Sequence, residues 1–64
     1  MPIIRVEMFE GRTDEQKADM AEALTEAFIR TAGGNPDSVQ IVITDVAKSN
    51  WASGGTLWSE KSKP

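Results

Sequence analysis

The fold of this chain is decided by residues 2–17, which read PIIRVEMFEGRTDEQK. In the first half of this stretch, residues alternate between the two sides of an extended backbone. One side carries Pro2, Ile4, Val6 and Met8, and the other carries Ile3, Arg5 and Glu7. A period of two predicts a β-strand with one buried face.

A turn and a helix follow this strand. Residues 10–12 break the alternation as a turn, and Thr13 and Gln16 then have the spacing of a capping box. The helix is expected from about Asp14 to Thr31, and the pair Gly33-Gly34 ends it. Its inward stripe consists of Met20, Leu24, Ala27, Phe28 and Thr31. Acidic residues on the other side are expected to form a solvated face and not a cation site.

A second strand is predicted from Ser38 to Val46 by the same alternation. Val39, Ile41 and Ile43 fall on one face, and Gln40, Val42 and Thr44 fall on the other. Strand, helix and strand in so short a chain predict a β-α-β unit with two parallel strands, of the α/β (α+β) class. Residues 51–57 predict a short hairpin, and the tail from Glu60 is expected to fray unless a neighbouring subunit holds it. A single domain over residues 1–64 is expected.

Composition narrows the ways in which so small a domain can be stable. A chain of 64 residues buries only about 60% of its unfolded surface, so disulfides, a metal or oligomerisation usually add stability. The absence of cysteine and histidine excludes disulfides and thiolate sites, and no metal site is expected. Oligomerisation is therefore the expected source of stability.

Charge and hydropathy argue against two classes of partner. The net charge is −3, and the basic residues are scattered along the chain, which argues against nucleic acid. No apolar run approaches the ~20 residues that span a bilayer, and the N-terminus has no signal-peptide pattern. A cytoplasmic protein that does not associate with membranes is the expectation.

Pro2 stands directly behind Met1. Methionine is usually removed before a small second residue, so the mature chain is expected to begin with proline. Burial or nearby cations would lower the pKa of this secondary amine from the ~7.7–8.0 of ordinary α-amino groups. An amine in the neutral range is a suitable general base at physiological pH. The alternative is a proline that only starts a strand.

Taken together, these features resemble the 4-oxalocrotonate tautomerase family over nearly the whole chain. The resemblance lies in Pro2 at the start of a strand, in the turn and cap EGRTDEQK at residues 10–17, and in the strand SVQIVIT at residues 38–44. It continues through Ala47-Lys48, the aromatic residue Trp51 and the pair Gly54-Gly55.

The resemblance implies a fold, an assembly and an activity. The subunit would be a β-α-β unit that dimerises through its sheet, with three dimers forming a hexamer of one chain or of two paralogues. The activity would be that of an isomerase without cofactor or metal, which moves a proton within unsaturated 2-hydroxy or 2-oxo acids, as in aromatic catabolism. Pro2 would be the catalytic base after removal of Met1.

The resemblance also assigns substrate-binding positions to Arg12 and Trp51. Arg12 matches an arginine that binds a substrate carboxylate, usually from a neighbouring subunit, and a guanidinium suits such bidentate recognition. Trp51 matches an aromatic residue that walls the site, where it would exclude water and keep the proline amine neutral. Trp58 has no matching role and is expected at an interface or on the surface.

Gln40 is the third substrate-binding position and departs from the family pattern. Well-characterised members carry a second arginine here, which polarises the 2-oxo group. Glutamine donates a neutral hydrogen bond but brings no charge, so turnover of a diacid is expected to be poor unless Arg5 or another cation substitutes. The pKa of the Pro2 amine should also be lowered less than beside two arginines. A substrate with a single carboxylate fits this change.

Two other functions stay open. The same scaffold can form an iminium with an aldehyde or, with Pro2 protonated, act as an acid in hydration or dehalogenation, although no single Asp or Glu stands clearly where water activation needs one. The chain can also be a non-catalytic oligomeric protein. A pH profile separates base from acid catalysis, because a base requires the neutral amine.

Overall fold

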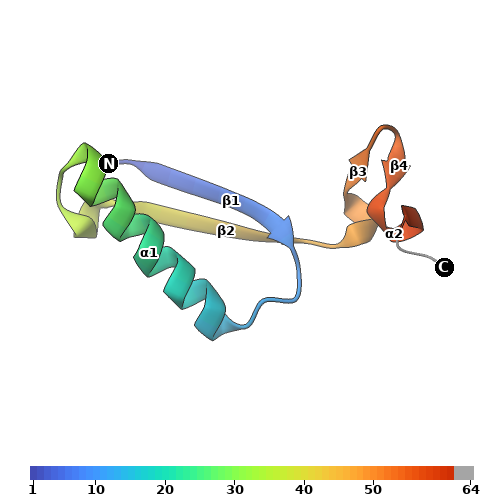
Figure 1. Cartoon of the computed structure of the whole chain (residues 1–64), viewed down its shortest axis with the longest axis horizontal. Coiled ribbons are helices and arrows are strands. Elements are labelled where there is room, and N and C mark those ends of the chain that lie inside the picture. The colour runs from blue at the N-terminus through green and yellow to red at the C-terminus, as the bar shows by residue number, and fades with distance from the viewer. Residues whose placement is uncertain (62–64) are drawn as a thin grey trace.

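The computed structural model describes residues 1–61 as a β-α-β body followed by a C-terminal arm, residues 47–61 (Figure 1). The body contains β1 (Ile3–Phe9), α1 (Asp14–Ala32) and β2 (Gln40–Val46), and the arm contains β3 (Ala52–Ser53), β4 (Thr56–Leu57) and α2 (Trp58–Lys61). Two 3-10 turns, Pro36–Ser38 and Lys48–Asn50, flank β2. The predicted order of strand, helix, strand and hairpin is confirmed.

The two long strands are parallel, as predicted, and in register from Ile3 opposite Gln40 to Phe9 opposite Val46. The prediction that the second strand begins at Ser38 is wrong. The Asn35 side chain accepts a hydrogen bond from the Asp37 amide at 3.0 Å, and the Ser38 amide donates to the Asn35 carbonyl at 2.9 Å. These bonds close a turn, so Ser38 is not available to the sheet.

The helix begins where the capping box predicts. The Gln16 amide donates to Thr13 Oγ1 at 3.1 Å, and the Thr13 amide donates to Gln16 Oε1 at 2.9 Å. Both bonds satisfy amides that the first helical turn would otherwise leave unpaired. The helix ends at Ala32 because Gly33 adopts a φ of 78°, which favours glycine.

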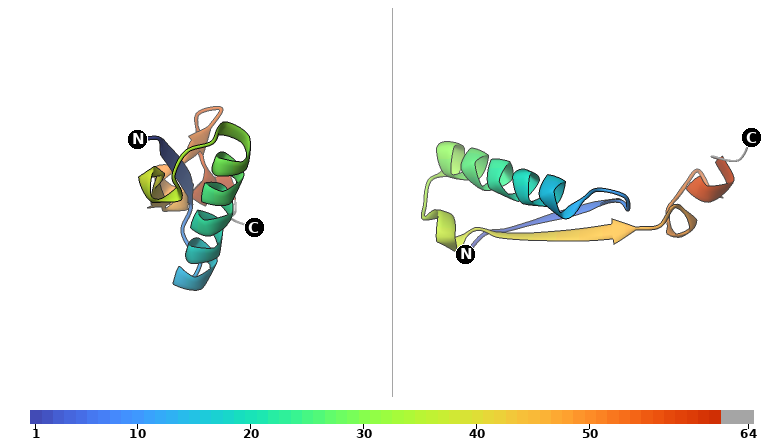
Figure 2. Two further views of the ribbon diagram at one scale, coloured as in Figure 1. Left: turned by 90° about the vertical axis from the view of Figure 1, so that its left-hand side faces the viewer. Right: turned by 90° about the horizontal axis from the view of Figure 1, so that it is seen from below.

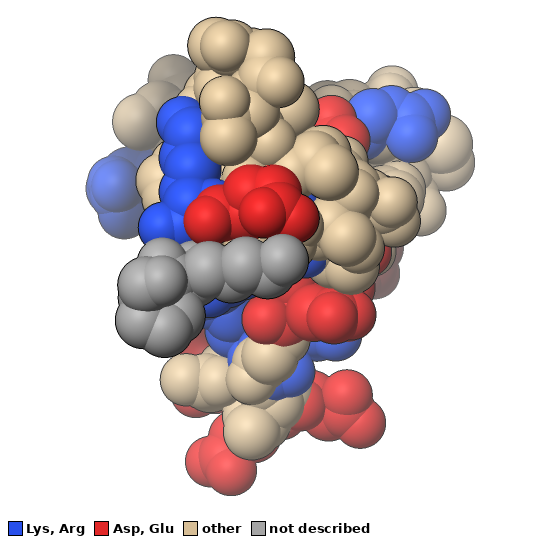
Figure 3. Space-filling view, turned by 90° about the vertical axis from the view of Figure 1, so that its right-hand side faces the viewer, with Lys and Arg blue, Asp and Glu red and all other residues tan. Residues whose placement is uncertain are grey.

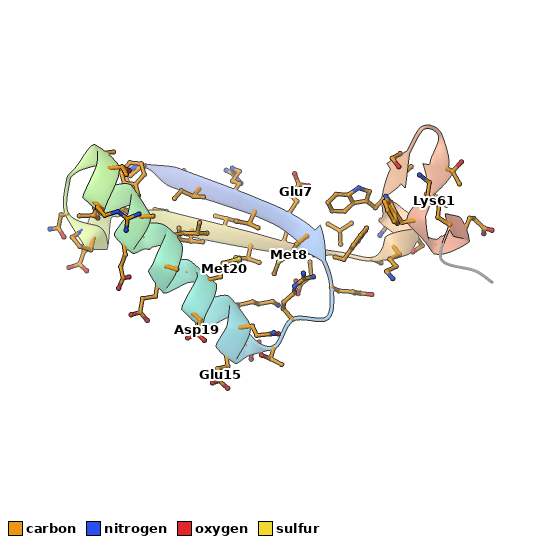
Figure 4. All side chains as sticks on the ribbon, in the orientation of Figure 1. Glu7, Met8, Glu15, Asp19, Met20 and Lys61 are labelled. Carbon is orange, nitrogen blue, oxygen red and sulfur yellow. The ribbon has the colours of Figure 1, made fainter. Side chains whose placement is uncertain are left out.

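Helix α1 covers one face of the two-stranded sheet (Figure 2). In Figure 4, Met8 and Met20 point into the space between sheet and helix, whereas Glu15 and Asp19 point away from the sheet. Other half-buried apolar residues of this layer include Ile4, Val6, Ala21, Leu24, Ala27, Phe28, Ile29, Ile41 and Ile43. Thr31, predicted to face inward, is exposed, and its hydroxyl donates to the Ala27 carbonyl at 2.7 Å.

An ion pair lies between the sheet and the start of the helix. Asp45 pairs with Met8 in the register, and its Oδ2 accepts from Lys17 Nζ at 2.6 Å. This hydrogen bond raises the pKa of Lys17 above its usual value. The ion pair with Lys17 accommodates the carboxylate of Asp45 at a strand position where the alternation would otherwise favour an apolar residue.

The sheet face opposite α1 is open and partly apolar. On it, Ile3 is 54% exposed and Val42 is 40% exposed. None of residues 1–61 is fully buried, and their radius of gyration is 15.1 Å. A compact domain of this length has a radius near 11 Å by the usual scaling. A single copy therefore has no closed core, and stabilisation by oligomerisation stays a prediction.

The arm is held by its own turn and by its last helix. The antiparallel hairpin pairs Ala52 with Leu57, and Gly54 and Gly55 between the strands have positive φ, which suits a tight hairpin turn. Lys61 Nζ donates to Ser53 Oγ at 2.6 Å. The predicted fraying from Glu60 is therefore wrong for Glu60 and Lys61, and the rest of that tail lies outside the described residues.

Candidate active site

Pro2 and Gln40 lie at one end of the sheet. Pro2 is half-buried, and its carbonyl accepts a hydrogen bond from the Gln40 amide at 2.9 Å. They meet because parallel strands begin at the same edge. The contact is between backbones: Gln40 pairs with Ile3 and is exposed on the open face, whereas the alternation places the Pro2 ring on the helix side.

Arg12 lies in the loop beyond the other end of β1. Gly11, at a φ of 124°, allows the chain to turn there. Arg12 is exposed, and its Nη1 donates to the Phe9 carbonyl at 3.3 Å. This bond ties the guanidinium to the end of the strand, with its charge available at the surface.

Trp51 lies near the same end of the sheet, beyond the end of β2. It is half-buried, and its ring centroid lies 4.7 Å from that of Phe9. Its carbonyl accepts a hydrogen bond from the Trp58 amide at 2.7 Å. Phe9 thus links the two predicted binding residues, Arg12 through its carbonyl and Trp51 through its ring.

The four predicted site residues form two separate groups in one chain. Strand β1 has seven residues, and a strand rises ~3.3 Å per residue, so roughly 20 Å separates the group of Pro2 and Gln40 from that of Arg12 and Trp51. Residues 1–61 of a single copy also enclose no pocket. A site that uses both groups therefore needs more than one copy of the chain.

Two basic side chains lie near Trp51. Lys48 Nζ lies 5.9 Å from the Phe9 ring centroid, and Arg12 lies on the same strand end. Seen from the end of the arm, basic and acidic side chains are interspersed and not segregated (Figure 3). Over the described part of the chain, no three acidic side chains come together as a metal site would need, and no helix is long and apolar enough to cross a bilayer.

Sequence reasoning missed Phe9 and left Trp58 without a role. The predicted strand stops at Met8, but the ladder continues to Phe9. Phe9 continues the period-two series Ile3, Arg5, Glu7 by one more step, and this was an available signal. Trp58 contacts Phe9 at 5.6 Å between ring centroids, and nothing in its local sequence pattern indicates this long-range contact.

The sequence model of the tautomerase enzyme family matches residues 2–61, from the proline to the end of the described arm. The chain belongs to the tautomerase family.

Individual tautomerases match over almost their full length. A probable tautomerase of Staphylococcus epidermidis is 39% identical over 61 residues, which are 95% of this chain and 100% of that protein. A 2-hydroxymuconate tautomerase of Bacillus subtilis is 38% identical over 60 residues, 94% of this chain and 97% of that protein.

The fold is matched by a solved structure as well. A heterohexameric 4-oxalocrotonate tautomerase from Chloroflexus aurantiacus superposes with a TM-score of 0.86 at 35% identity, covering 94% of this chain and 97% of that one. The predicted β-α-β tautomerase fold with a short C-terminal hairpin is thus confirmed.

Proposed function

We propose that this protein is a cofactor-independent tautomerase that uses the amine of Pro2, after removal of Met1, as its general base. The observation that carries the proposal is the place of Pro2 in a chain of the tautomerase family, immediately before β1 and within the matched residues 2–61. Met1 is 90% exposed, so an aminopeptidase can reach it. Its removal would convert the Pro2 nitrogen from an amide into a basic secondary amine.

The proposed reaction is a proton transfer within one substrate. The neutral amine takes the proton of the 2-hydroxyl group of an unsaturated 2-hydroxy acid. The oxygen becomes the 2-oxo group as the double bonds shift, and the resulting ammonium returns a proton to a carbon farther along the chain. Atoms and charge balance over the cycle, and a proton-accepting group near neutral pKa serves both halves.

In this proposal the site forms between copies of the chain. Pro2 and Arg12 lie at opposite ends of β1, so a carboxylate held by Arg12 next to a Pro2 amine needs the two residues from different copies. The open face with Ile3 and Val42 offers apolar area for such an assembly. A hexamer, of this chain alone or with a paralogue, meets both requirements.

Gln40 limits the substrate that such a site would favour. Arg12 supplies one fixed positive charge for one carboxylate, whereas Gln40 supplies only a neutral hydrogen-bond donor. The substrate class is therefore a 2-hydroxy or 2-oxo acid with one carboxylate. A diacid such as 2-hydroxymuconate would be turned over less well.

The proposal is tested by the pH dependence of ketonisation, measured with 2-hydroxypentadienoate and with 2-hydroxymuconate. For protein shown by mass to lack Met1, we expect kcat/KM to rise with pH as the amine loses its proton and then to level off. Protein that retains Met1, made with methionine aminopeptidase inhibited, should show at most the background rate, because an amide nitrogen is not basic.

Three other outcomes would argue against Pro2 as a general base. Activity that falls as the amine deprotonates would indicate Pro2 acting as an acid, as in hydration or dehalogenation. Equal activity with and without Met1 would contradict a role for the Pro2 amine. No activity on either acid would leave a non-catalytic oligomeric protein as the better description.

A further inference from the structure

Three of the four aromatic side chains of this protein gather at one place. Phe9 at the end of β1 lies against Trp51, with ring centroids 4.7 Å apart and planes at 54°. It also meets Trp58, at 5.6 Å and 65°. Tilted and edge-to-face pairs of this kind are favourable arrangements of aromatic rings. We call Phe9, Trp51 and Trp58 the aromatic cluster.

Trp58 is fixed in place by contacts within the C-terminal arm. Its amide donates to the Trp51 carbonyl at 2.7 Å, which closes the hairpin and brings the two tryptophans side by side. Lys61 Nζ lies 5.1 Å from the Trp58 ring centroid and is itself bonded to Ser53. Trp58 is nevertheless 36% exposed, whereas Trp51 is half-buried. Part of the Trp58 side chain is therefore open to solvent in a single copy, next to the backbone of Trp51.

The aromatic cluster would suit one kind of substrate tail better than another. A tail that leaves Arg12 along Trp51 meets flat apolar rings whose faces carry partial negative charge. An aryl or alkenyl tail gains buried apolar area there, whereas a carboxylate tail loses water and faces the ring electrons. Two ammonium groups also lie over these rings, Lys48 over Phe9 and Lys61 over Trp58, so an anionic tail is the alternative that the test must separate.

We propose that Trp58, beside Trp51, is a specificity-determining residue whose indole packs against the tail of the substrate, so that the enzyme favours monocarboxylic 2-hydroxy or 2-oxo acids with an aryl tail. This inference rests on the proposed function, because it assumes that Trp51 walls the site in which Pro2 acts. It assigns to Trp58 a role that its position in the sequence does not indicate.

The test compares three acids that differ in the tail. The enol of phenylpyruvate has an aryl tail and one carboxylate, 2-hydroxypentadienoate has a short tail and one carboxylate, and 2-hydroxymuconate has a carboxylate tail. For the Met1-free protein, kcat/KM should be highest for the aryl acid. Trp58→Ala should lower the ratio of kcat/KM for the aryl acid to that for the short acid about tenfold, mainly through KM. Trp58→Phe should restore most of this ratio.

Matched variants separate recognition from folding. Leu57→Ala removes the adjacent apolar side chain, which is 40% exposed and lies outside the cluster, and should leave the ratio unchanged. Should Trp58→Ala not fold, Trp58→Leu keeps an apolar side chain but removes the flat ring and should still lower the ratio. Lys61→Met tests the alternative explanation, in which the Lys61 ammonium binds an anionic tail of the substrate.

Each result bears on the inference. An unchanged ratio in Trp58→Ala, with equal losses or no loss for the aryl and short acids, would overturn the inference about Trp58 while leaving the proposed tautomerase activity intact. A preference for 2-hydroxymuconate that is lost in Lys61→Met would overturn it in favour of an anionic tail. No turnover of any of the three acids by the wild-type protein would instead reject the proposed function itself.

Discussion

Replacing Pro2 with alanine in the Met1-free protein is expected to lower kcat for 2-hydroxypentadienoate by about 10²–10⁴-fold, the usual contribution of a positioned acid–base group. Alanine keeps an α-amino group but loses the ring that fixes the nitrogen to the start of β1. The free primary amine is also expected to titrate near ~7.7–8.0, where less of it is neutral at pH 7. Both effects reduce the concentration of a correctly placed base. Stopped-flow absorbance of the dienol measures the loss.

The control for this variant is assembly. The Pro2 carbonyl, and not its side chain, accepts the bond from Gln40, and alanine keeps that carbonyl. We therefore expect Pro2→Ala to have the same sedimentation coefficient and circular dichroism as the wild type. A variant that assembles normally and retains full activity would contradict the role of Pro2 as the base.

Replacing Gln40 with arginine is expected to raise kcat/KM for 2-hydroxymuconate by up to about a hundredfold, because one well-placed electrostatic donor contributes about 10²–10³ in rate. The gain on 2-hydroxypentadienoate should be smaller, because the new arginine can polarise the 2-oxo group of either acid but only the diacid has a second carboxylate for the added charge to bind. The added cation should also lower the pKa of the Pro2 amine. Steady-state kinetics on both acids and NMR titration of the amine give the three values.

Two control variants at the same position separate the causes. Gln40→Lys adds a charge without the planar fork and should give a smaller gain than arginine. Gln40→Met removes the hydrogen bond at similar length and should give no gain on either acid. An arginine variant that is no better on the diacid, or equally better on both acids, would contradict the account of Gln40.

Much of the fold could be predicted from local pattern. The alternation of residues 2–8, the capping box at Thr13 and the glycines after Ala32 each act within a few residues, and each appears in the structure where expected. The error at Ser38 has a local cause too. Asn35 bonds to the backbone of the next residues and holds them in a turn, in competition with the apolar alternation that favoured a strand.

The arrangement of the site could be predicted less well, because it depends on the end of the sheet at which each residue lies. Parallel pairing places Gln40 beside Pro2 and sends Arg12 and Trp51 to the far end. The sequence alone indicated each residue but not their separation within one copy. The bond of Lys61 to Ser53 and the contact of Trp58 with Phe9 are tertiary, and no periodicity in the chain indicates them.

The central claim is that a Pro2-dependent site is completed by Arg12 of another copy. Subunit complementation tests this claim most directly. Pro2→Ala and Arg12→Ala are each expected to lose most activity when refolded alone. Mixed in equal amounts in denaturant and refolded together, they should recover about one quarter of wild-type activity, since random assembly joins an intact Pro2 to an intact Arg12 in that share of sites. The double variant mixed with either single variant should recover none. Activity no greater than the sum of the two separate samples would contradict a shared site.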